Sequence, residues 1–283
     1  MTRLIINGDD FGATSSINRA VVRAFRRGIL TSCSLMVGGQ GFHEAARMAR
    51  DIEGLAVGLH LVAVMGKSVL PPDRLPTLVD RQGRFRTDPV SSGLLCFFSR
   101  RARRELGHEL RAQFERFLST GLGMSHVDSH LHFHLHPVIF RMTVELCGEY
   151  GIRGMRVPED DPGLLSSFRG GTSFQQRSMS RLFRIFTRRM KARLSAEGIV
   201  YPRRVFGHLM TGCMDRGYVL HLLDHLPEGD FEIYFHPGES EGDSALAAQR
   251  HRELEILLDP DVKGRIADRG IHLIHYGHLA RAS

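Results

Sequence analysis

The sequence predicts an α/β fold in which about seven mostly parallel strands alternate with helices. Short apolar runs rich in β-branched residues alternate along the chain with segments whose apolar residues recur at helical spacing. The first of these runs is apolar on both faces, as strands inside a parallel sheet are. Aspartate and histidine residues directly follow several of the runs, at the strand ends where α/β folds place their binding sites.

The composition is that of a globular protein with a sizeable core, because 42% of the 283 residues are hydrophobic and 24% are charged. No run of about 18 apolar residues could cross a membrane. The N-terminus leads into an acid-bearing strand, which argues against a secretory signal peptide. The four cysteines lack CxxC spacing, so we expect reduced, buried thiols in a cytoplasmic protein at Cys33, Cys96, Cys147 and Cys213.

The first predicted strand ends at two adjacent acids. Residues 4–6 form an apolar run that stops at Gly8, and Asp9 and Asp10 follow before the chain turns. Two carboxylates at the carboxyl end of a buried strand favour a functional site. The alternative is a turn aspartate followed by a helix cap, because Asp is common at both positions.

Helical and strand patterns then alternate to the end of the chain. The predicted helices cover residues 15–25, 43–49, 107–118, 137–150, 218–225 and 245–258. The predicted strands cover residues 4–8, 29–37, 55–61, 125–129, 152–157, 231–236 and 271–275, with a weaker one at 205–207. Residues 71–89 have no period, which predicts a long loop of the kind that serves as a lid. With no linker or repeat visible, we expect one barrel-like domain over residues 1–283, with insertions at about 66–105 and 162–200.

A histidine-rich segment follows the strand expected at residues 125–129. Alternate side chains share a face in an extended chain, so one side would carry His126, Asp128, His130, His132, His134 and His136. Such a row of imidazoles would repel itself once protonated unless a metal ion or a carboxylate held some of them. The pattern therefore favours a metal site over histidines that only pack in a core.

A carboxylate from the first strand, His60 at the end of the third and a histidine of this row make a set of two imidazoles and one carboxylate. Three protein ligands leave positions open for water and substrate, which is typical of catalytic metal sites. These groups can converge only if the strand ends meet at one mouth, as they do in a barrel.

The same motifs, taken in order, resemble those of the YdjC-like carbohydrate deacetylases. The resemblance rests on Asn7-Gly8-Asp9-Asp10-Phe11-Gly12, Gly58-Leu59-His60, His126-Val127-Asp128-Ser129-His130 and Tyr234-Phe235-His236-Pro237-Gly238. It runs across nearly the whole chain, with Gly8 standing where the family more often has alanine. Within the family, the sequence looks similar to the branch associated with hopanoid biosynthesis.

The resemblance implies a distorted TIM-like barrel, an N-acetylated sugar substrate and one bound divalent ion. By position, Asp10, His60 and His130 would bind the ion, and Asp9 would be the general base. The family's ion is usually described as Mg²⁺, whereas two imidazoles with one carboxylate suit Zn²⁺ or another transition metal better. The identity of the ion stays open between these two.

Amide hydrolysis needs an activated water, a polarised carbonyl and a proton for the departing amine. A bound divalent ion lowers the pKa of its water from about 15.7 towards ~7 and also polarises the acetyl oxygen. Asp9 would accept the proton of this water nucleophile, and His236 is the candidate general acid. The alternative for His236 is a histidine that only caps its strand.

Four further residues are assigned to the surroundings of the site. Asp128 is expected to fix a ligand histidine from behind. Arg156 could orient Asp9, bind substrate or lie on the surface. His132 and His134 could stand behind the ligands or face the substrate, and the sequence does not choose between these positions.

Two basic segments account for much of the net charge of +7. Residues 162–196 contain no acid, and a helix there would carry Arg181, Arg184, Arg188, Phe183 and Phe186 at a membrane-facing side. The apolar run 94–98, followed by four arginines, repeats the pattern. Such segments suit an anionic membrane interface, although a surface helix that packs its apolar stripe on the barrel has the same pattern. Nucleic acid is disfavoured because no aromatic platform accompanies the charge.

We therefore predict a metal-dependent hydrolase that removes acetate from an N-acetylglucosamine-type sugar on a glycolipid, specifically N-acetylglucosaminyl bacteriohopanetetrol. It would be cytoplasmic, with peripheral contact at the inner face of the membrane, and its oligomeric state stays open, a homodimer included. The alternatives are a metal-dependent phosphoesterase or glycosidase on the same barrel, and a non-enzymatic basic protein that binds lipid. A glycosidase needs two carboxylates about 5–9.5 Å apart, which adjacent Asp9 and Asp10 do not obviously supply.

Overall fold

The computed structural model describes the backbone of residues 1–170, 174–239 and 244–279, and the side chains of these residues except 174–177 and 179–183. Its centre is a parallel sheet in the order β4-β3-β2-β1-β6-β5, with β7 paired to β1. The strands are β1 (Thr2–Phe11), β2 (Ser32–Leu35), β3 (Ala56–Leu61), β4 (Met124–Ser129), β5 (Arg204–Phe206), β6 (Gly229–Phe235) and β7 (His272–Ile274). The prediction of an α/β fold with about seven parallel strands is confirmed.

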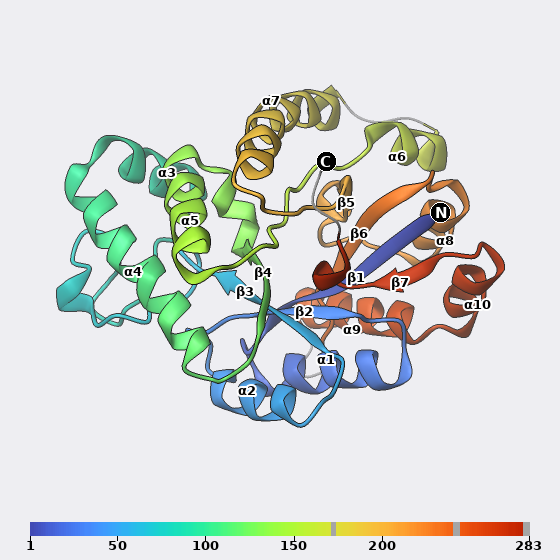
Figure 1. The fold of residues 1–283 in the computed structure, drawn as a ribbon, viewed down its shortest axis with the longest axis horizontal. Helices are drawn as coiled ribbons and strands as arrows, with labels where there is room; N and C mark the ends of the chain where they lie inside the picture. The colour runs from blue at the N-terminus through green and yellow to red at the C-terminus, as the bar shows by residue number, and fades with distance from the viewer. Residues whose placement is uncertain (171–173, 240–243, 280–283) are drawn as a thin grey trace.

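Helices surround the sheet on its outer side (Figure 1). They are α1 (Ser15–Arg27), α2 (Phe42–Arg50), α3 (Pro89–Phe98), α4 (Arg100–Leu118), α5 (Pro137–Tyr150), α6 (Pro162–Arg169), α7 (Phe174–Ala196), α8 (Arg216–His225), α9 (Ala245–Leu258) and α10 (Pro260–Asp268). Short 3₁₀ turns are η1 (Pro72–Arg74), η2 (His130–Leu135), η3 (His208–Met210) and η4 (Tyr276–His278). In the described part of the chain, no helix combines the length and apolarity that crossing a membrane requires.

The sheet curls into a half-barrel around β1. One edge of β1 pairs with β6 along residues 2–8, and the opposite edge is shared between β7 at residues 3–5 and β2 at residues 7–11. This arrangement is consistent with a distorted barrel, and closure of the TIM type stays a prediction. Because the strands are parallel, their carboxyl ends meet at one mouth, which is what brings distant motifs together.

The predicted strand at residues 152–157 is wrong. Over the described residues β4 and β5 form no direct ladder, and residues 152–159 run between them. The amide of Arg156 donates to Val127 O on the β4 side (3.0 Å), and the amide of Met155 donates to Val200 O on the other side (3.0 Å). The segment alternates between two neighbours and so makes only isolated bridges.

Local sequence explains most of the helix boundaries. Thr14 accepts a hydrogen bond from the amide of Ile17 at the start of α1, as expected for an N-cap. The predicted helix at residues 107–118 begins earlier, at Arg100, where Ser99 caps α4. Its apolar stripe is buried as predicted, at Leu106, Leu110, Phe114 and Phe117. The helix α10 has no counterpart in the prediction, and α3 contains the apolar run 94–98, which was predicted only as part of a basic segment.

Side chains of α4 form hydrogen bonds with the start of the predicted long loop and with the residues just before it. Glu109 accepts hydrogen bonds from the amides of Val69 (2.8 Å) and Leu70 (2.9 Å). Glu105 accepts from the amide and the hydroxyl of Thr77, each at 2.8 Å. These buried acids lie one helical turn apart, so one face of α4 fixes the start of the loop over the mouth of the sheet.

Candidate active site

The two acids at the end of β1 both reach the mouth of the sheet. Regular alternation would point Asp9 and Asp10 to opposite faces. A register shift between Gly8 and Phe11 and a left-handed backbone at Asp10 (φ 63°) break this alternation. Both carboxylates are buried, and each has an oxygen within 4.8 Å of a nitrogen of His60.

The three predicted metal ligands lie together. One oxygen of Asp10, Oδ1, is 3.1 Å from His130 Nδ1 and 3.5 Å from His60 Nε2. Ligand atoms of all three residues lie within 4.8 Å of one another, although the residues come from β1, β3 and the turn after β4. Two imidazole nitrogens and a carboxylate oxygen at this spacing are a donor set that fits one divalent ion.

The other oxygen of Asp10 contacts a residue that the sequence did not single out. Oδ2 accepts a hydrogen bond from Arg250 on α9. Burial by itself would raise the pKa of Asp10, but His130, His236 and Arg250 together lower it well below its usual value. Arg250 is separated from Asp10 by 240 positions, so sequence spacing carried no signal for it.

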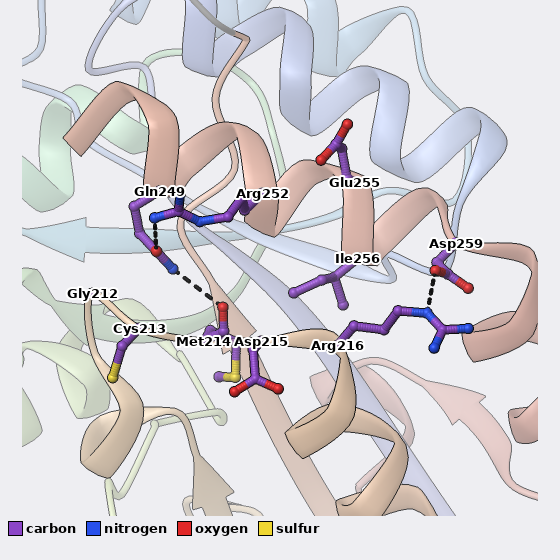
Figure 2. Close-up of a pocket in the computed structure, with 10 residues that line it drawn as sticks. All are labelled: Gly212, Cys213, Met214, Asp215, Arg216, Gln249, Arg252, Glu255, Ile256 and Asp259. Carbon is purple, nitrogen blue, oxygen red and sulfur yellow. Dashed lines mark hydrogen bonds and ion pairs between the residues drawn. The ribbon is translucent and has the colours of Figure 1, made fainter. Parts of the chain in front are cut away.

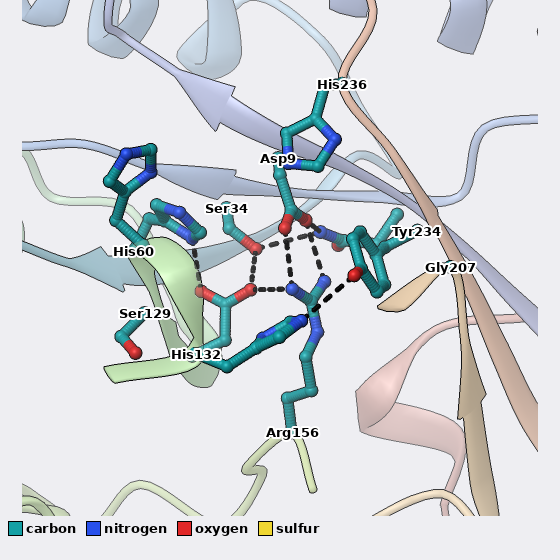
Figure 3. A network of polar contacts seen from close by, with 12 residues as sticks. Asp9, Ser34, His60, Ser129, His132, Arg156, Gly207, Tyr234 and His236 are labelled. Atoms are coloured by element: carbon teal, nitrogen blue, oxygen red, sulfur yellow. Dashed lines mark hydrogen bonds and ion pairs between the residues drawn. The ribbon is translucent and has the colours of Figure 1, made fainter. Parts of the chain in front are cut away.

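Arg156 is the hub of the buried charges (Figure 3). Its guanidinium donates to both oxygens of Asp9, at 2.7 and 2.8 Å, and to Glu232 on β6. It also lies 2.7 Å from Asp128 Oδ2. The side chain is fully buried, so the surface alternative for Arg156 is wrong. The sequence did not single out Glu232 because it is one acid within an otherwise apolar strand.

Asp128 stands behind His60, as the sequence suggested. Its Oδ1 accepts a hydrogen bond from His60 Nδ1 at 2.8 Å, which turns Nε2 of the same ring towards Asp10. Burial by itself would lower the pKa of His60, but Asp128, Asp9 and Asp10 raise it to about 9. A carboxylate in this position fixes the orientation of the ring and increases its basicity.

The prediction that the histidines share one side of an extended chain is wrong beyond Ser129. The chain leaves the strand there and enters η2, with left-handed backbones at Leu131 and His132. A helical turn distributes side chains around its axis, so the alternation of an extended chain ends. His130 therefore points to Asp10, whereas His134 is buried between Ser129 Oγ (2.6 Å) and Arg156 O (3.0 Å).

The side chains of His132 and His136 contact other parts of the protein. His132 is buried, with Nε2 3.0 Å from the hydroxyl of Tyr234. Burial is the main reason why its pKa lies well below the usual value. His136 faces α3, and its ring lies 6.2 Å from that of Phe97. His134 thus lies behind the site, and His132 lies in the wall beside Tyr234.

His236 lies just past the end of β6, close to the two acids. Figure 3 shows its ring above Asp9, and its charge contributes to lowering the pKa of Asp10. Its amide donates to the buried Glu253 of α9, and the ring is partly exposed. Its ring also packs edge-on against Tyr234, with ring centres 5.6 Å apart.

A pocket of about 620 Å³ opens over Asp10 and His130. Its other walls come from residues 36–40, from residues 65–67 before the predicted loop, and from the loop itself, which contributes Arg84 and Phe85 among others. The loop therefore covers the candidate site, as expected of a lid. Met65 has a left-handed backbone, like Asp10, Leu131 and His132, so every non-glycine residue described with positive φ lies at this site.

A second cleft, of about 600 Å³, lies between residues 212–216 and α9 (Figure 2). Arg216 there is bonded to Asp259, and Gln249 to the carbonyl of Met214. None of its lining residues was predicted to be functional. Cys213 at its edge is exposed, so the expectation of four buried thiols is wrong for this one, while the other three are buried.

The membrane-facing side proposed for α7 is only partly described. Arg184 and Arg188 are exposed, Phe186 is partly buried, and the side chains of Arg181 and Phe183 lie outside the described residues. Further along α7, Met190 and Leu194 are buried. The second half of the helix therefore packs an apolar stripe on the rest of the protein, as surface helices do.

The chain is similar over nearly its whole length to proteins named as deacetylases. The chain is 33% identical to a carbohydrate deacetylase of Brevibacillus brevis, over 98% of this chain and 99% of that protein. It is 29% identical to a chitooligosaccharide deacetylase of Escherichia fergusonii, over 96% and 97%. A crystal structure from Enterococcus faecalis, provisionally described as a cellobiose-phosphate cleavage protein, superposes with a TM-score of 0.75 at 27% identity, covering 98% of each chain.

The sequence model of one family matches almost the whole chain. This model, described as YdjC-like protein, aligns with residues 3–268 and so includes every motif discussed above. On this match and on the identity over the full length, the chain belongs to the YdjC-like family.

Proposed function

We propose that this protein is a metal-dependent N-deacetylase that releases acetate from an N-acetylglucosamine-type sugar. The observation that carries the proposal is the meeting of Asp10, His60 and His130 within 4.8 Å, with Asp9 held beside them by Arg156. The names of the relatives support a carbohydrate deacetylase. We infer a metal site because the three residues reach one point from separate elements.

Asp10, His60 and His130 would hold one divalent ion, Mg²⁺ or Zn²⁺. The donor set of two nitrogens and one oxygen suits a transition ion such as Zn²⁺ better than Mg²⁺. When bound, the ion would polarise the acetyl carbonyl and acidify a water molecule. Asp128 would keep the His60 ring in place through the hydrogen bond to Nδ1.

Asp9 would be the general base, and its contacts indicate which oxygen acts. Oδ1 accepts hydrogen bonds from Arg156 (2.8 Å) and Asn7 (2.8 Å), whereas Oδ2 accepts only from Arg156 (2.7 Å) among the described residues. A carboxylate oxygen offers two lone-pair directions. Oδ2 therefore keeps one free to accept a proton from water, while Arg156 and Asn7 prevent the group from rotating.

His236 would donate the proton that the departing sugar nitrogen needs. Its ring lies above Asp9 (Figure 3) and is partly exposed, so it can meet a substrate that enters from solvent. The contact with Glu253 ties its backbone to α9. A general acid of this kind contributes about 10²–10⁴-fold to the rate.

We further propose that the sugar is part of a glycolipid, with N-acetylglucosaminyl bacteriohopanetetrol as the specific candidate. The basis is the resemblance to the hopanoid-associated branch of the family. The half-exposed apolar side chains of Met65 and Leu131 near the mouth support a substrate with an apolar portion. The enzyme would meet such a substrate by peripheral contact with a membrane.

The test is acetate release from this glycolipid and from a soluble chitooligosaccharide by the metal-loaded protein. Asp9→Asn should lower kcat by about 10²–10⁴-fold while Zn²⁺ still binds in a calorimetric titration. Asp10→Asn should abolish that binding. Release of phosphate instead of acetate from phosphorylated sugars, or full activity of Asp9→Asn, would refute the deacetylase. Activity on the oligosaccharide alone would refute only the glycolipid.

A further inference from the structure

The helix α3 carries its large apolar residues on the outside. Its buried residues are Ser92, Gly93 and Cys96, all small. Its exposed residues are large and apolar, with exposed fractions of 70% for Val90, 55% for Leu94, 51% for Phe97 and 74% for Phe98. A surface helix of a globular protein normally has the opposite polarity, so this face is built to be covered by something else.

The four exposed residues form one stripe. They are spaced at i, i+4, i+7 and i+8, which places them on the same side of a helix. In Figure 1, α3 lies at the periphery, beside α4 and α5. By contrast, the described half of α7 buries Met190 and Leu194. Among the described side chains of the two basic segments, a continuous exposed apolar stripe is found on α3.

Positive charge borders the stripe. Arg100 and Arg104, at the start of α4, are exposed and make no ion pair with the described residues. The same holds for Arg86, which lies just before α3. Arg101 differs, because it pairs with Glu105 at 2.9 Å. Exposed aromatic and aliphatic side chains beside unpaired arginines match an interface of acyl chains and anionic headgroups.

The charge also argues against a second copy of the chain as the occupant. In a two-fold symmetric contact the same patch meets itself. Two sets of three arginines would then lie opposite each other, and like charges repel. The one acid between Arg86 and Arg104 is Asp88, whose carboxylate already caps α3. An anionic lipid surface offers the complementary charge.

The stripe lies next to the catalytic mouth. The ring of Phe97 is 6.2 Å from that of His136, at the end of η2. His130, the proposed metal ligand, begins the same turn, and the next residue, Leu131, is half exposed. The amide of Met65, which lines the pocket, donates to the carbonyl of Arg86. Contact at α3 would therefore bring the mouth to the level of the headgroups.

We propose that the stripe of Val90, Leu94, Phe97 and Phe98, bordered by Arg86, Arg100 and Arg104, docks the protein on an anionic bilayer with the catalytic mouth facing the lipid. Docking goes beyond the deacetylation proposed above and does not depend on it. It assigns to α3 the membrane contact that the sequence placed mainly on residues 162–196.

The chain has no tryptophan, which allows a direct test with the full-length protein. Phe97→Trp places a single fluorophore in the stripe, and Leu246→Trp places one at an exposed apolar site on α9. Vesicles of equimolar phosphatidylcholine and phosphatidylglycerol should shift the emission of Phe97→Trp to the blue, and a brominated lipid should quench it. Leu246→Trp should respond to neither addition.

Sedimentation with the same vesicles measures the contribution of each part. Phe97→Ser with Phe98→Ser, and separately Arg100→Gln with Arg104→Gln, should each weaken binding by roughly tenfold or more. Ile185→Ser on α7 and Leu246→Ser should bind as the parent protein does. Circular dichroism should show unchanged folding, since all these side chains are exposed. Vesicles of phosphatidylcholine alone should bind far less protein, and so should the anionic vesicles at high salt.

Three results would overturn the docking proposal. One is the absence of binding to anionic vesicles by the parent protein at low salt. Another is undiminished binding of the Phe97→Ser, Phe98→Ser variant. The third is a dimer in light scattering that this variant converts to a monomer, which would make the stripe a subunit interface. Acetate release from a soluble oligosaccharide would be unaffected in each case, so the two proposals fail separately.

Discussion

At the scale of single residues, the site depends on one buried cation. Arg156 faces the carboxylates of Asp9, Asp128 and Glu232. Burial by itself would lower the pKa of Arg156, but these acids raise it well above its usual value. The guanidinium therefore stays charged, and it balances acids that could not otherwise remain ionised in a buried position.

Arg156→Met should be strongly destabilising. It leaves three buried carboxylates without their cation, and breaking a buried pair of this kind costs about 3–5 kcal/mol. Urea denaturation at neutral pH measures the loss. Arg153→Met, which removes an exposed arginine three positions away, should change the free energy of unfolding by about 0.5 kcal/mol or less. Equal stability of the two variants would contradict the role of Arg156 as the hub.

Gly58 is required because a histidine ring occupies the space beside it. A Cβ at this position would lie 2.3 Å from Cε1 of His126. The His126 ring is itself fixed by stacking on Tyr276, with ring centres 4.0 Å apart, so it cannot easily move away. The glycine of the Gly58-Leu59-His60 motif therefore makes room within the sheet two residues before a proposed ligand.

Gly58→Ala should cost about 1–3 kcal/mol through overpacking, and His126→Ala should relieve part of this loss in the double variant. Gly148→Ala is the matched control, because no atom lies within 4 Å of its added Cβ on α5. A helical glycine replaced by alanine should gain about 0.5–1 kcal/mol. Thermal denaturation of the parent protein and the four variants separates these effects, and additive losses in the double variant would rule out the clash.

At the scale of elements, α4 acts as a clamp for the loop that covers the pocket. Glu105, Glu109 and Gln113 follow one another at four-residue spacing, and all are buried. Gln113 bonds the amide and the carbonyl of Val62, at 2.9 and 2.7 Å, and also Glu109. Polar side chains on the inner face of a helix thus satisfy backbone groups of a segment without regular structure.

Glu109→Ala should loosen the loop. It removes the acceptor for the amides of Val69 and Leu70, so hydrogen exchange at these two amides should speed up. KM should rise more than kcat falls, because the loop lines the pocket but supplies no proposed catalytic group. Glu115→Ala, on the exposed side of the same helix, should leave exchange and KM unchanged. Unaltered exchange in Glu109→Ala would show that α4 does not hold the loop.

At the scale of the whole molecule, the half-barrel gathers an unusual density of buried titratable groups under its mouth. Desolvation lowers the pKa of His126 and His134 to about 4 in each case, even though Asp128 opposes the effect. Both rings are therefore neutral in the folded protein at neutral pH. Their unfolded counterparts titrate near the ordinary value of about 6.5.

Stability should therefore fall in mild acid. Between about pH 6.5 and 4 the unfolded chain takes up protons that these two buried rings do not. Each ring thus contributes on the order of 3 kcal/mol above pH 6.5, lost as the pH falls towards 4. Asp160 acts in the opposite direction, because burial raises its pKa to about 6, so part of the loss is offset as the pH falls.

His126→Phe provides the check, since an aromatic ring can still stack on Tyr276. Between pH 6.5 and 4, the slope of its free energy of unfolding against pH should be smaller than that of the parent protein. The difference between the two slopes should be up to about 1.4 kcal/mol per pH unit. His225→Phe, at an exposed histidine of α8, should keep the slope of the parent protein. Urea denaturation at several pH values measures both, and parallel curves for the parent and His126→Phe would contradict the prediction.

The sequence by itself determined the order of most strands and helices and the positions of Asp10, His60 and His130 at strand ends. These follow from short-range rules, because apolar periodicity sets the elements and parallel strands bring their ends to one mouth. The pairing of Asp128 with His60 could be anticipated for the same reason, since both lie at neighbouring strand ends.

Only the tertiary structure decided the groups that come from distant or irregular segments. Arg250 meets Asp10 across 240 positions, and Arg156 meets Glu232 from a segment that makes no regular strand. The left-handed turn after Ser129 separated the histidines that alternation would have aligned. The uncovered face of α3 could not be recognised either, because periodicity shows that a helix has an apolar side, whereas what covers that side depends on the packing of the whole chain.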